Sequence, residues 1–550
     1  MRSQCEPCRI DGRSTARGPS GSAQGAKRHC YPCAVKAFPV LFALALAGMA
    51  HPEDDLAGSK PNIILFLADD LSYRDLSAWG QERFATPNLD RLATGGIRFT
   101  QAYAGSQECA PSRGTLMTGL HTGHAPIRRN RSARGQDHLA DEDVTIAEVL
   151  KRSGYATGFF GKWGIGLPGT PGTPDRQGFD EAFGFYDQRR AHTFFPHFLY
   201  RNGRKIDYPG NLGFDMGHIY RDNATPPGER DSDAHYDKGG RVIPPGVPDR
   251  SQAVYSEAVI EDAALEFVRK HRDGPFFLYF ATQLPHGPVI IDRLGSLLGR
   301  TDFPSTAHKE WAAMVLRMDA FAGELTALLE ELGIRERTLL AFASDNGYSM
   351  CGYFARGNRD SGWQDDPFFR NKGPFRGGKF SLLEGGIRVP FFVSWPGAVR
   401  PAVSSAPVWL IDLFPTFADL ADSPAVPPHD GQSLVPILRG DGGAFPTDRP
   451  LYWENDREQA VRLGPWKAYR RDSSGEMELF LIEEDVGSER DLADLYPEVV
   501  AAAERIMRRE HVDHPWYWNP TETRADFERK QALAAELGQL QLTRGDNQHP

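Results

Sequence analysis

Cysteine is scarce in this 550-residue chain, which contains six cysteines in all. A protein of this size with so few cysteines is not built on disulfides. Only Cys109 and Cys351 follow residue 50, and we assign no role to Cys351. The other four form two Cys-x-x-Cys pairs with zinc-knuckle spacing, but no packed domain fits around them, which disfavours a functional zinc site. These four are Cys5, Cys8, Cys30 and Cys33.

Long apolar runs are also rare. Ala34–Ala47 is the one stretch that could concern a membrane, and it follows the basic residues Lys27 and Arg28. It leads into a small-x-small pattern ending at Ala50, which predicts the apolar region of a secretory signal rather than a membrane span. We therefore expect residues 1–50 to be an N-terminal extension plus a signal peptide cleaved near Ala50. The mature protein would be exported, either periplasmic or secreted, without a stable membrane span.

An excess of positive charge is absent as well. The formal net charge is −10, and the charged residues form no long runs of one sign. This balance argues against nucleic-acid binding as the main task. A chain of 550 residues can bury a large core and is expected to divide into one large domain and a smaller one.

Segments typical of buried strands alternate with helical segments between about residues 60 and 400. Ile63–Leu67, for example, is a continuous apolar run of the kind found in strands buried on both faces. The alternation predicts an α/β fold with a large, mostly parallel mixed sheet flanked by helices. Short strands and one helix after about residue 447 predict a small antiparallel α+β C-terminal subdomain. We thus expect a main domain over 57–445, the C-terminal subdomain over 446–520 and a peripheral tail over 521–550.

Several predicted strands end in polar or charged residues. The carboxyl ends of parallel strands are where open α/β sheets bind their ligands, so these residues are expected at one site. For Asp69 and Asp70 taken alone, the alternative is that they cap the following turn. Carboxylate and amide oxygens suit Ca²⁺ or Mg²⁺ and disfavour zinc, and calcium is our expectation. The strand-end residues are Asp69, Asp70, Lys162, His286, Asp345 and Asn346.

Cys109 precedes a segment, 110–119, that can form a helix, and Pro111 is tolerated in a first helical turn. The cysteine would then lie at a helix N-terminus, where free N–H groups and the helix dipole favour an anion. Arg113 follows one turn later on the same face. The stretch thus brings together a nucleophile, an anion site and a fixed cation, although a lone cysteine is more often a small buried residue.

The Cys-Ala-Pro-Ser-Arg sequence at 109–113 resembles the Cys-x-Pro-Ser-Arg signature of the type I, formylglycine-dependent sulfatases of the alkaline phosphatase-like superfamily. The resemblance extends, in the same order, over most of residues 60–400. It includes Asp-Asp at 69–70, Gly-Lys-Trp at 161–163, Pro-His-Gly-Pro at 285–288, Ser-Asp-Asn-Gly at 344–347, and Gly-Gly-Lys with Glu-Gly-Gly-Ile-Arg-Val-Pro between 377 and 390.

The resemblance implies a sulfuric ester hydrolase whose Cys109 is oxidised to formylglycine by a maturation enzyme, which would be a partner of this chain. It implies contacts to sulfate and the nucleophile from Arg113 and Lys162. It also implies contacts to the leaving group from His286 and Lys379, either of which could protonate the departing alcohol. The metal ligands that it implies are Asp69, Asp70, Cys109, Asp345 and Asn346.

Gly164 departs from the family pattern, which usually reads Gly-Lys-Trp-His. Since that histidine is credited with a role at the formylglycine hydroxyl, another base is needed, and His192 is our candidate. A surface or substrate-contact role for His192 is the alternative. His192 lies in an aromatic and cationic segment, 183–203, which suits a pocket for a sulfated sugar but could equally be a packed surface loop. The expected substrate-binding residues are Lys162, Lys379, His286, Arg189 and Arg190.

Two other functions stay open on the sequence. A phosphatase or phosphodiesterase of the same superfamily would usually carry a Thr or Ser nucleophile and a second metal site, and Cys109 argues against it. A non-catalytic relative that binds sulfated glycans would be expected to lose Cys109, Arg113 or Lys379, and all three are present.

Overall fold

A computed structural model describes residues 56–211, 252–287, 289–349, 365–471, 475–519 and 522–537 of the chain. The predicted signal peptide, the four early cysteines and Cys351 lie outside the described residues.

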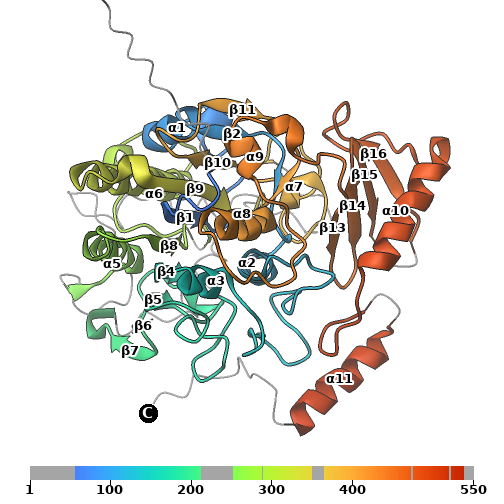
Figure 1. Cartoon of the computed structure of the whole chain (residues 1–550), viewed down its shortest axis with the longest axis horizontal. Coiled ribbons are helices and arrows are strands. Elements are labelled where there is room, and N and C mark those ends of the chain that lie inside the picture. The colour runs from blue at the N-terminus through green and yellow to red at the C-terminus, as the bar shows by residue number, and fades with distance from the viewer. Residues whose placement is uncertain are drawn as a thin grey trace, which may run out of the picture. The chain divides into compact units, whose positions relative to one another are not determined.

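A ten-stranded mixed sheet is the main element of the described residues, in the strand order β11-β2-β10-β9-β1-β8-β4-β5-β6-β7 (Figure 1). The five strands from β9 to β5 are parallel, and antiparallel pairings to β10 and β6 add strands on either side. This confirms the predicted fold class. The strands are β1 (Asn62–Ala68), β2 (Ile97–Phe99), β4 (Ala156–Lys162), β5 (Glu181–Phe185), β6 (Phe198–Arg201), β7 (Arg204–Asp207), β8 (Phe276–Ala281), β9 (Thr338–Ser344), β10 (Phe391–Ser394) and β11 (Ala402–Ser404).

The packing of strand β1 explains why its sequence is apolar throughout. Ile63, Leu65 and Leu67 belong to a core on one face of the sheet, while Ile64 and Phe66 belong to the core on the other face. A strand covered on both faces has no solvent side on which to place polar residues. Helices α1 (Pro87–Thr94), α5 (Ser256–Lys270) and α6 (Thr306–Glu331) cover one face, and α2 (Cys109–Thr118), α3 (Ile146–Arg152), α8 (Leu413–Leu420) and α9 (Val435–Leu438) cover the other.

The register of the parallel strands places their carboxyl ends nearly level. Ala68 of β1 pairs with Ser344 of β9, and Ala281 of β8 pairs with both Leu67 of β1 and Gly161 of β4. The next residues of β1, β9 and β4 therefore meet at one edge of the sheet. This edge is where the predicted site residues stand.

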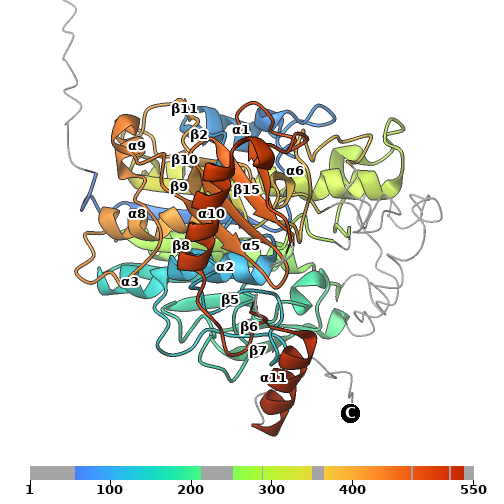
Figure 2. The ribbon, with the colours of Figure 1, turned by 90° about the vertical axis from the view of Figure 1, so that its right-hand side faces the viewer.

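The C-terminal part of the chain forms a separate four-stranded antiparallel sheet, as predicted. One face packs against residues of the main domain that include Tyr103 and Ile387, and the other packs on α10 (Pro497–Glu510), which crosses in front of the sheet in Figure 2. Helix α11 (Arg524–Glu536) follows with Ala534 as its one buried residue. No described helix has both the length and the apolar character needed to cross a membrane. The four strands are β13 (Leu451–Glu454), β14 (Gln459–Leu463), β15 (Trp466–Arg470) and β16 (Glu478–Leu481).

Strand β5 was not predicted from the sequence. The sequence also did not predict the short strands β2, β6, β7 and β11, nor a two-stranded sheet of β3 (Ala102–Tyr103) and β12 (Val408–Trp409). These short strands have two to four residues, which is too short for a hydrophobic period to identify them.

Candidate active site

Cys109 is the first residue of α2 and is fully buried. Its Sγ lies 3.4 Å from Asp69 Oδ1 and 3.2 Å from the Lys379 ammonium. Burial raises the pKa of the Cys109 thiol to about 12, although Lys162 and Lys379 oppose this. An unmodified thiol here is protonated at neutral pH and is a poor nucleophile.

The N-terminus of α2 is held by polar groups that the sequence had not singled out. Glu108 forms an ion pair with Arg129 instead of capping the helix with its own side chain. Asn130 Oδ1 accepts a hydrogen bond from Ala110 N at 2.9 Å. The segment after α2 thus folds back over the start of the helix and fixes the position of Cys109.

Arg113 and Lys162 lie on the same side of the cluster. Arg113 donates two hydrogen bonds to Asp345 Oδ2, at 3.0 and 2.8 Å, and a third to the Lys162 carbonyl at 2.6 Å. The Lys162 ammonium lies 2.6 Å from Asp69 Oδ2. Although burial raises the pKa of Asp69, Lys162 and the other cations hold it well below its usual range.

Lys379 and His286 form the other side of the cluster. The Lys379 ammonium lies 2.6 Å from Asp70 Oδ1 and 3.3 Å from His286 Nε2. His286 Nδ1 donates to the Gly287 carbonyl, which leaves Nε2 facing the lysine. Burial lowers the pKa of His286 to about 4 against the opposing effect of Asp70, so the imidazole is neutral.

His192 joins this group from a distant part of the chain. It ends the 3₁₀ turn η2 (Arg190–His192), its ring stacks on His286 with centroids 3.8 Å apart, and its Nε2 lies 3.4 Å from the Lys162 ammonium. Burial, His286 and Lys162 lower the pKa of His192 well below its usual value. A neutral imidazole therefore lies beside Lys162, and the role of His192 as a base stays a prediction.

Gln188 occupies the space beside Gly164. A Cβ added to Gly164 would lie 2.4 Å from Gln188 Oε1 and 3.9 Å from Arg113 Cδ, and Gly164 has a left-handed φ of +79°. Gln188 Oε1 is buried and accepts no hydrogen bond from a described residue. The gap left by the absent histidine is thus filled by a side chain that sequence reasoning missed, because no pattern links positions 164 and 188.

Arg189 and Arg190, expected to contact the substrate, lie at the start of the same 3₁₀ turn. The Arg190 guanidinium packs over the Phe198 ring, 4.6 Å from its centroid. Backbone N–H groups of both arginines donate to Asp187 Oδ1. These contacts order the turn that carries His192, and they direct Arg190 towards β6.

The oxygens at this edge fit a hard divalent cation. Ligand atoms of Asp69, Asp70, Cys109 and His286 lie within 4.8 Å of one another, and His286 is an addition to the predicted set. Asn346 Oδ1 is buried and accepts no hydrogen bond from a described residue. The amide oxygen of Asn346, together with the carboxylates of Asp69, Asp70 and Asp345, suits calcium.

Asp345 and Ser349 complete the carboxylate network. Asp345 Oδ1 accepts a hydrogen bond from Asp70 N at 3.1 Å, and Asp70 has a left-handed φ of +65°. Ser349, which the sequence had not marked, donates to Asp70 Oδ2 at 2.6 Å. Burial and the charge of Asp69 raise the pKa of Asp345 to about 6, against the effect of Arg113. Arg113 thus offsets only part of the effect that burial and the Asp69 charge have on this carboxyl.

A second histidine and carboxylate group among the described residues contains His121, His124 and Glu510. Gly123 N donates to His121 Nδ1 at 3.1 Å, so the neutral ring carries its proton on Nε2, which lies 3.3 Å from Glu510 Oε2. A nitrogen that keeps its proton cannot bind a metal. This group is therefore a hydrogen-bonded contact between the segment after α2 and the end of α10.

Comparisons with known proteins agree with this geometry. Residues 61–423 match the family model described as Sulfatase. The chain is 30% identical over 500 residues to N-acetylgalactosamine-6-O-sulfatase of Bacteroides thetaiotaomicron, covering 82% of this chain and 92% of that protein. It is 32% identical over 456 residues to arylsulfatase A of Homo sapiens, covering 78% and 77%. The crystal structure of Ps i-CgsB in complex with k-i-k-neocarrahexaose matches 88% of this chain and 100% of its own, with a TM-score of 0.65 and 26% identity.

Proposed function

Since this chain belongs to the sulfatase family and is a sulfuric ester hydrolase, we propose that its substrate is a sulfated carbohydrate. We propose also that Cys109 is converted to formylglycine and that one calcium ion binds beside it. The observation that carries the proposal is the position of Cys109 at the start of α2, in contact with both Asp69 and Lys379. The sugar named in one relative and the oligosaccharide bound by Ps i-CgsB support a carbohydrate substrate.

The modification would supply a hydrated aldehyde that attacks sulfur and later releases sulfate, and calcium would supply positive charge beside it. Arg113 and Lys162 would supply fixed positive charge where charge develops on the sulfate oxygens. Their own carboxylate partners hold both side chains in place, so little reorganisation is needed during the reaction. Asp69, Asp70, Asp345 and Asn346 would hold the metal.

Proton transfer would involve Lys379, His286 and His192. Lys379 is charged, because the Asp70 carboxylate raises its pKa well above the usual value despite burial. It would therefore donate a proton to the departing alcohol, while the neutral Nε2 of His286 accepts a hydrogen bond from the ammonium and orients it. His192, neutral and beside Lys162, would take the proton whose loss allows sulfate to leave. These three roles are proposals that the distances support.

A phosphatase or phosphodiesterase function has no support among the named matches to the family model and the curated relatives, which are sulfatases.

Export remains a proposal that rests on the apolar segment ending near Ala50. Expression of the full chain with its N-terminus intact, followed by N-terminal sequencing of the exported product, should give a start close to His51. A product retained in the cytoplasm with its first 50 residues would contradict export.

The test of the proposed function begins with coexpression of the chain and a formylglycine-generating enzyme. Mass spectrometry of the peptide that contains Cys109 should show the mass loss of thiol-to-aldehyde conversion. The matured enzyme should release sulfate from at least one member of a panel of sulfated mono- and oligosaccharides, with N-acetylgalactosamine 6-sulfate tested first. Cys109→Ala should be inactive toward the whole panel. Full activity of a preparation that carries only unmodified cysteine would overturn the proposal.

A further inference from the structure

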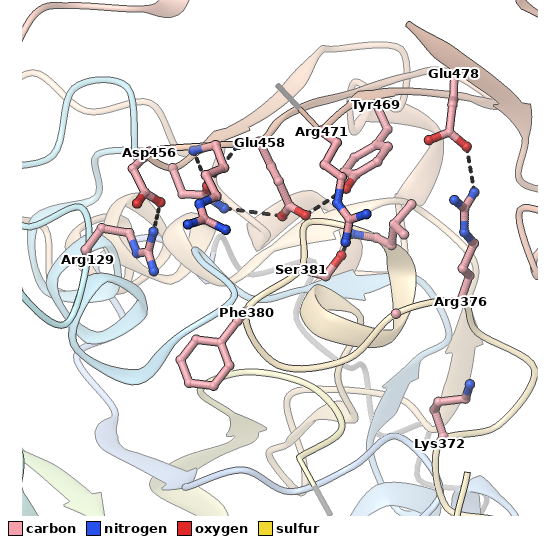
Figure 3. Close-up of a pocket in the computed structure, with 14 residues that line it drawn as sticks. Arg129, Lys372, Arg376, Phe380, Ser381, Asp456, Glu458, Tyr469, Arg471 and Glu478 are labelled. Carbon is pink, nitrogen blue, oxygen red and sulfur yellow. Dashed lines mark hydrogen bonds and ion pairs between the residues drawn. The ribbon is translucent and has the colours of Figure 1, made fainter. Parts of the chain in front are cut away.

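A cavity of about 570 Å³ lies where the 372–383 loop of the main domain meets the four-stranded C-terminal sheet (Figure 3). One wall comes from the β13–β14 turn and the end of β15, and the other from the loop that carries Lys379. None of the residues that line it belongs to the predicted site. Apart from Gly377 of the Gly-Gly-Lys motif, its lining residues also lie outside the motifs that carried the family resemblance.

Positive charge dominates the walls of this cavity. Five cationic side chains and three carboxylates line it. Arg457 and Arg471 are exposed and form no ion pair with a described residue. Burial raises the pKa of Glu458, which weakens its ability to offset these charges, although Arg471 acts in the opposite direction. The carboxylates have other partners: Asp456 pairs with Arg129, Glu478 with Arg376 at 2.7 Å, and Glu458 accepts from Tyr469 Oη at 2.7 Å and Leu382 N at 2.8 Å.

Phe380 projects into the cavity from an unusual backbone conformation. Its φ is +76°, a left-handed value that a bulky side chain adopts only when its surroundings impose it. The imposing contacts are hydrogen bonds from Phe380 N to the Gln107 carbonyl at 3.0 Å and from Lys379 N to the Tyr348 carbonyl at 2.7 Å. Figure 3 shows the ring pointing away from Ser381, below the pair of Arg129 and Asp456. Strain of this kind is typical of residues that clamp a ligand.

Two short contacts link the lining of the cavity to the active site. The Phe380 ring centroid is 5.6 Å from the Lys379 ammonium, which itself contacts Cys109. On the opposite wall, Arg129 pairs with Glu108, the residue before Cys109. A sugar linked to the one whose sulfate is attacked would therefore extend towards these walls.

We propose that this cavity is a subsite for a second, acidic sugar, and that the preferred substrate is an oligosaccharide with more than one anionic group. Arg457 and Arg471 would bind the sulfate or carboxylate of that sugar, since guanidinium groups bind such oxyanions through paired hydrogen bonds. Phe380 supplies an apolar face for its ring. The inference rests on the proposed function, because it names the substrate class of the same site.

The experiment compares two substrates that share the sugar to be desulfated. One is the sulfated monosaccharide that the panel selects, and the other is the disaccharide in which a uronic acid is linked to it. Wild-type enzyme should have the higher kcat/KM for the disaccharide. The double variant Arg457→Ala/Arg471→Ala should raise KM for the disaccharide about tenfold or more, with a much smaller change for the monosaccharide. Phe380→Ala should shift the preference in the same direction.

Arg505→Ala is the matched control, because Arg505 is an exposed arginine of α10 that forms no ion pair with a described residue and lies outside the cavity lining. It should keep the wild-type preference. Added salt should reduce the preference of the wild type more than that of the double variant. A double variant that folds, acts on both substrates and keeps the wild-type ratio would overturn the subsite alone. Inactivity of the matured wild type toward every sulfated sugar would instead overturn the proposed function, and the subsite with it.

Discussion

The cluster around Cys109 and the cavity of Figure 3 both gather cations, but they balance them in different ways. In the cluster, Lys162 and Lys379 each lie 2.6 Å from a carboxylate oxygen and are buried. In the cavity, Arg457 and Arg471 are exposed and have no such partner among the described residues. Buried charges must be paired, because an uncompensated one costs several kcal/mol, about 3–5 when a single partner is removed. The expected reacting groups thus lie at buried strand ends, where each charge needs a partner. Substrate preference can depend instead on exposed residues of the cavity, where a substitution leaves no buried charge unpaired.

Removing one carboxylate from the buried cluster is the strongest test of this contrast. Asp345→Asn keeps the side chain's shape but removes charge from Arg113 and from the expected metal site. We expect metal content and kcat to fall together, by about a hundredfold or more. Metal analysis and sulfate release are the measurements, and Asp273→Asn, at an exposed position, is the control. Full metal content with full activity in Asp345→Asn would show that the cluster does not depend on its charge balance.

His192 tests whether a residue that joins the cluster from outside the strand ends takes part in the chemistry. If it is the base for sulfate release, His192→Ala should lower kcat about a hundredfold, with a sulfated enzyme accumulating after the first turnover. Rapid-quench mass spectrometry of the Cys109 peptide would detect that species. His429→Ala, a partly buried histidine elsewhere, should behave as wild type. A raised KM without trapped enzyme would assign His192 to substrate contact instead.

Gly164 sharpens the comparison, because the Gln188 side chain lies beside it within the buried site. Gly164→His should lower activity about tenfold or more, since its Cβ would meet Gln188 Oε1 and its φ of +79° costs a side chain about 1–3 kcal/mol. Adding Gln188→Ala should recover part of the loss by vacating the space. Steady-state kinetics and melting temperatures of the two single variants and the double variant check this. A double variant no better than Gly164→His would mean that Gln188 does not occupy the missing histidine's place.

The smallest effect is expected where the C-terminal sheet meets the main domain. Glu454 and Asp430 raise the pKa values of His511 and His124 by hydrogen bonding to the charged rings, with burial opposing this in each case. A histidine whose pKa is raised on folding stabilises the protein below its unfolded pKa, and the stabilisation is lost as pH rises through the folded pKa. Both rings are partly exposed, so solvent screening keeps the contribution small.

We therefore expect Tm to fall by roughly 1–2 °C between pH 6 and 9 on account of these two histidines. Replacing His511 by Asn should flatten that dependence, and differential scanning calorimetry of the two proteins across this range is the measurement. An identical pH profile in both proteins would show that this contact does not titrate with folding.

The sequence predicted the elements that are long or carry a strong pattern. Strand β1, helix α6 and the four C-terminal strands are in this group, because burial on two faces or a regular alternation leaves a clear trace. The predicted site residues at the strand ends also come together, since parallel strands must present their carboxyl ends to one edge. Short strands such as β2 and β12 left no period to detect.

The sequence by itself determined which reactive side chains lie at the carboxyl edge of the main sheet. Asp69, Asp345, Lys162 and Cys109 each follow from a strand or helix end whose position is fixed by local patterns and by the parallel sheet. Only the tertiary structure decided which residues surround them. Gln188 fills the space beside Gly164 and Phe380 turns into the cavity because of contacts between segments far apart in the chain. Such contacts depend on packing in three dimensions, and no spacing along the chain encodes them.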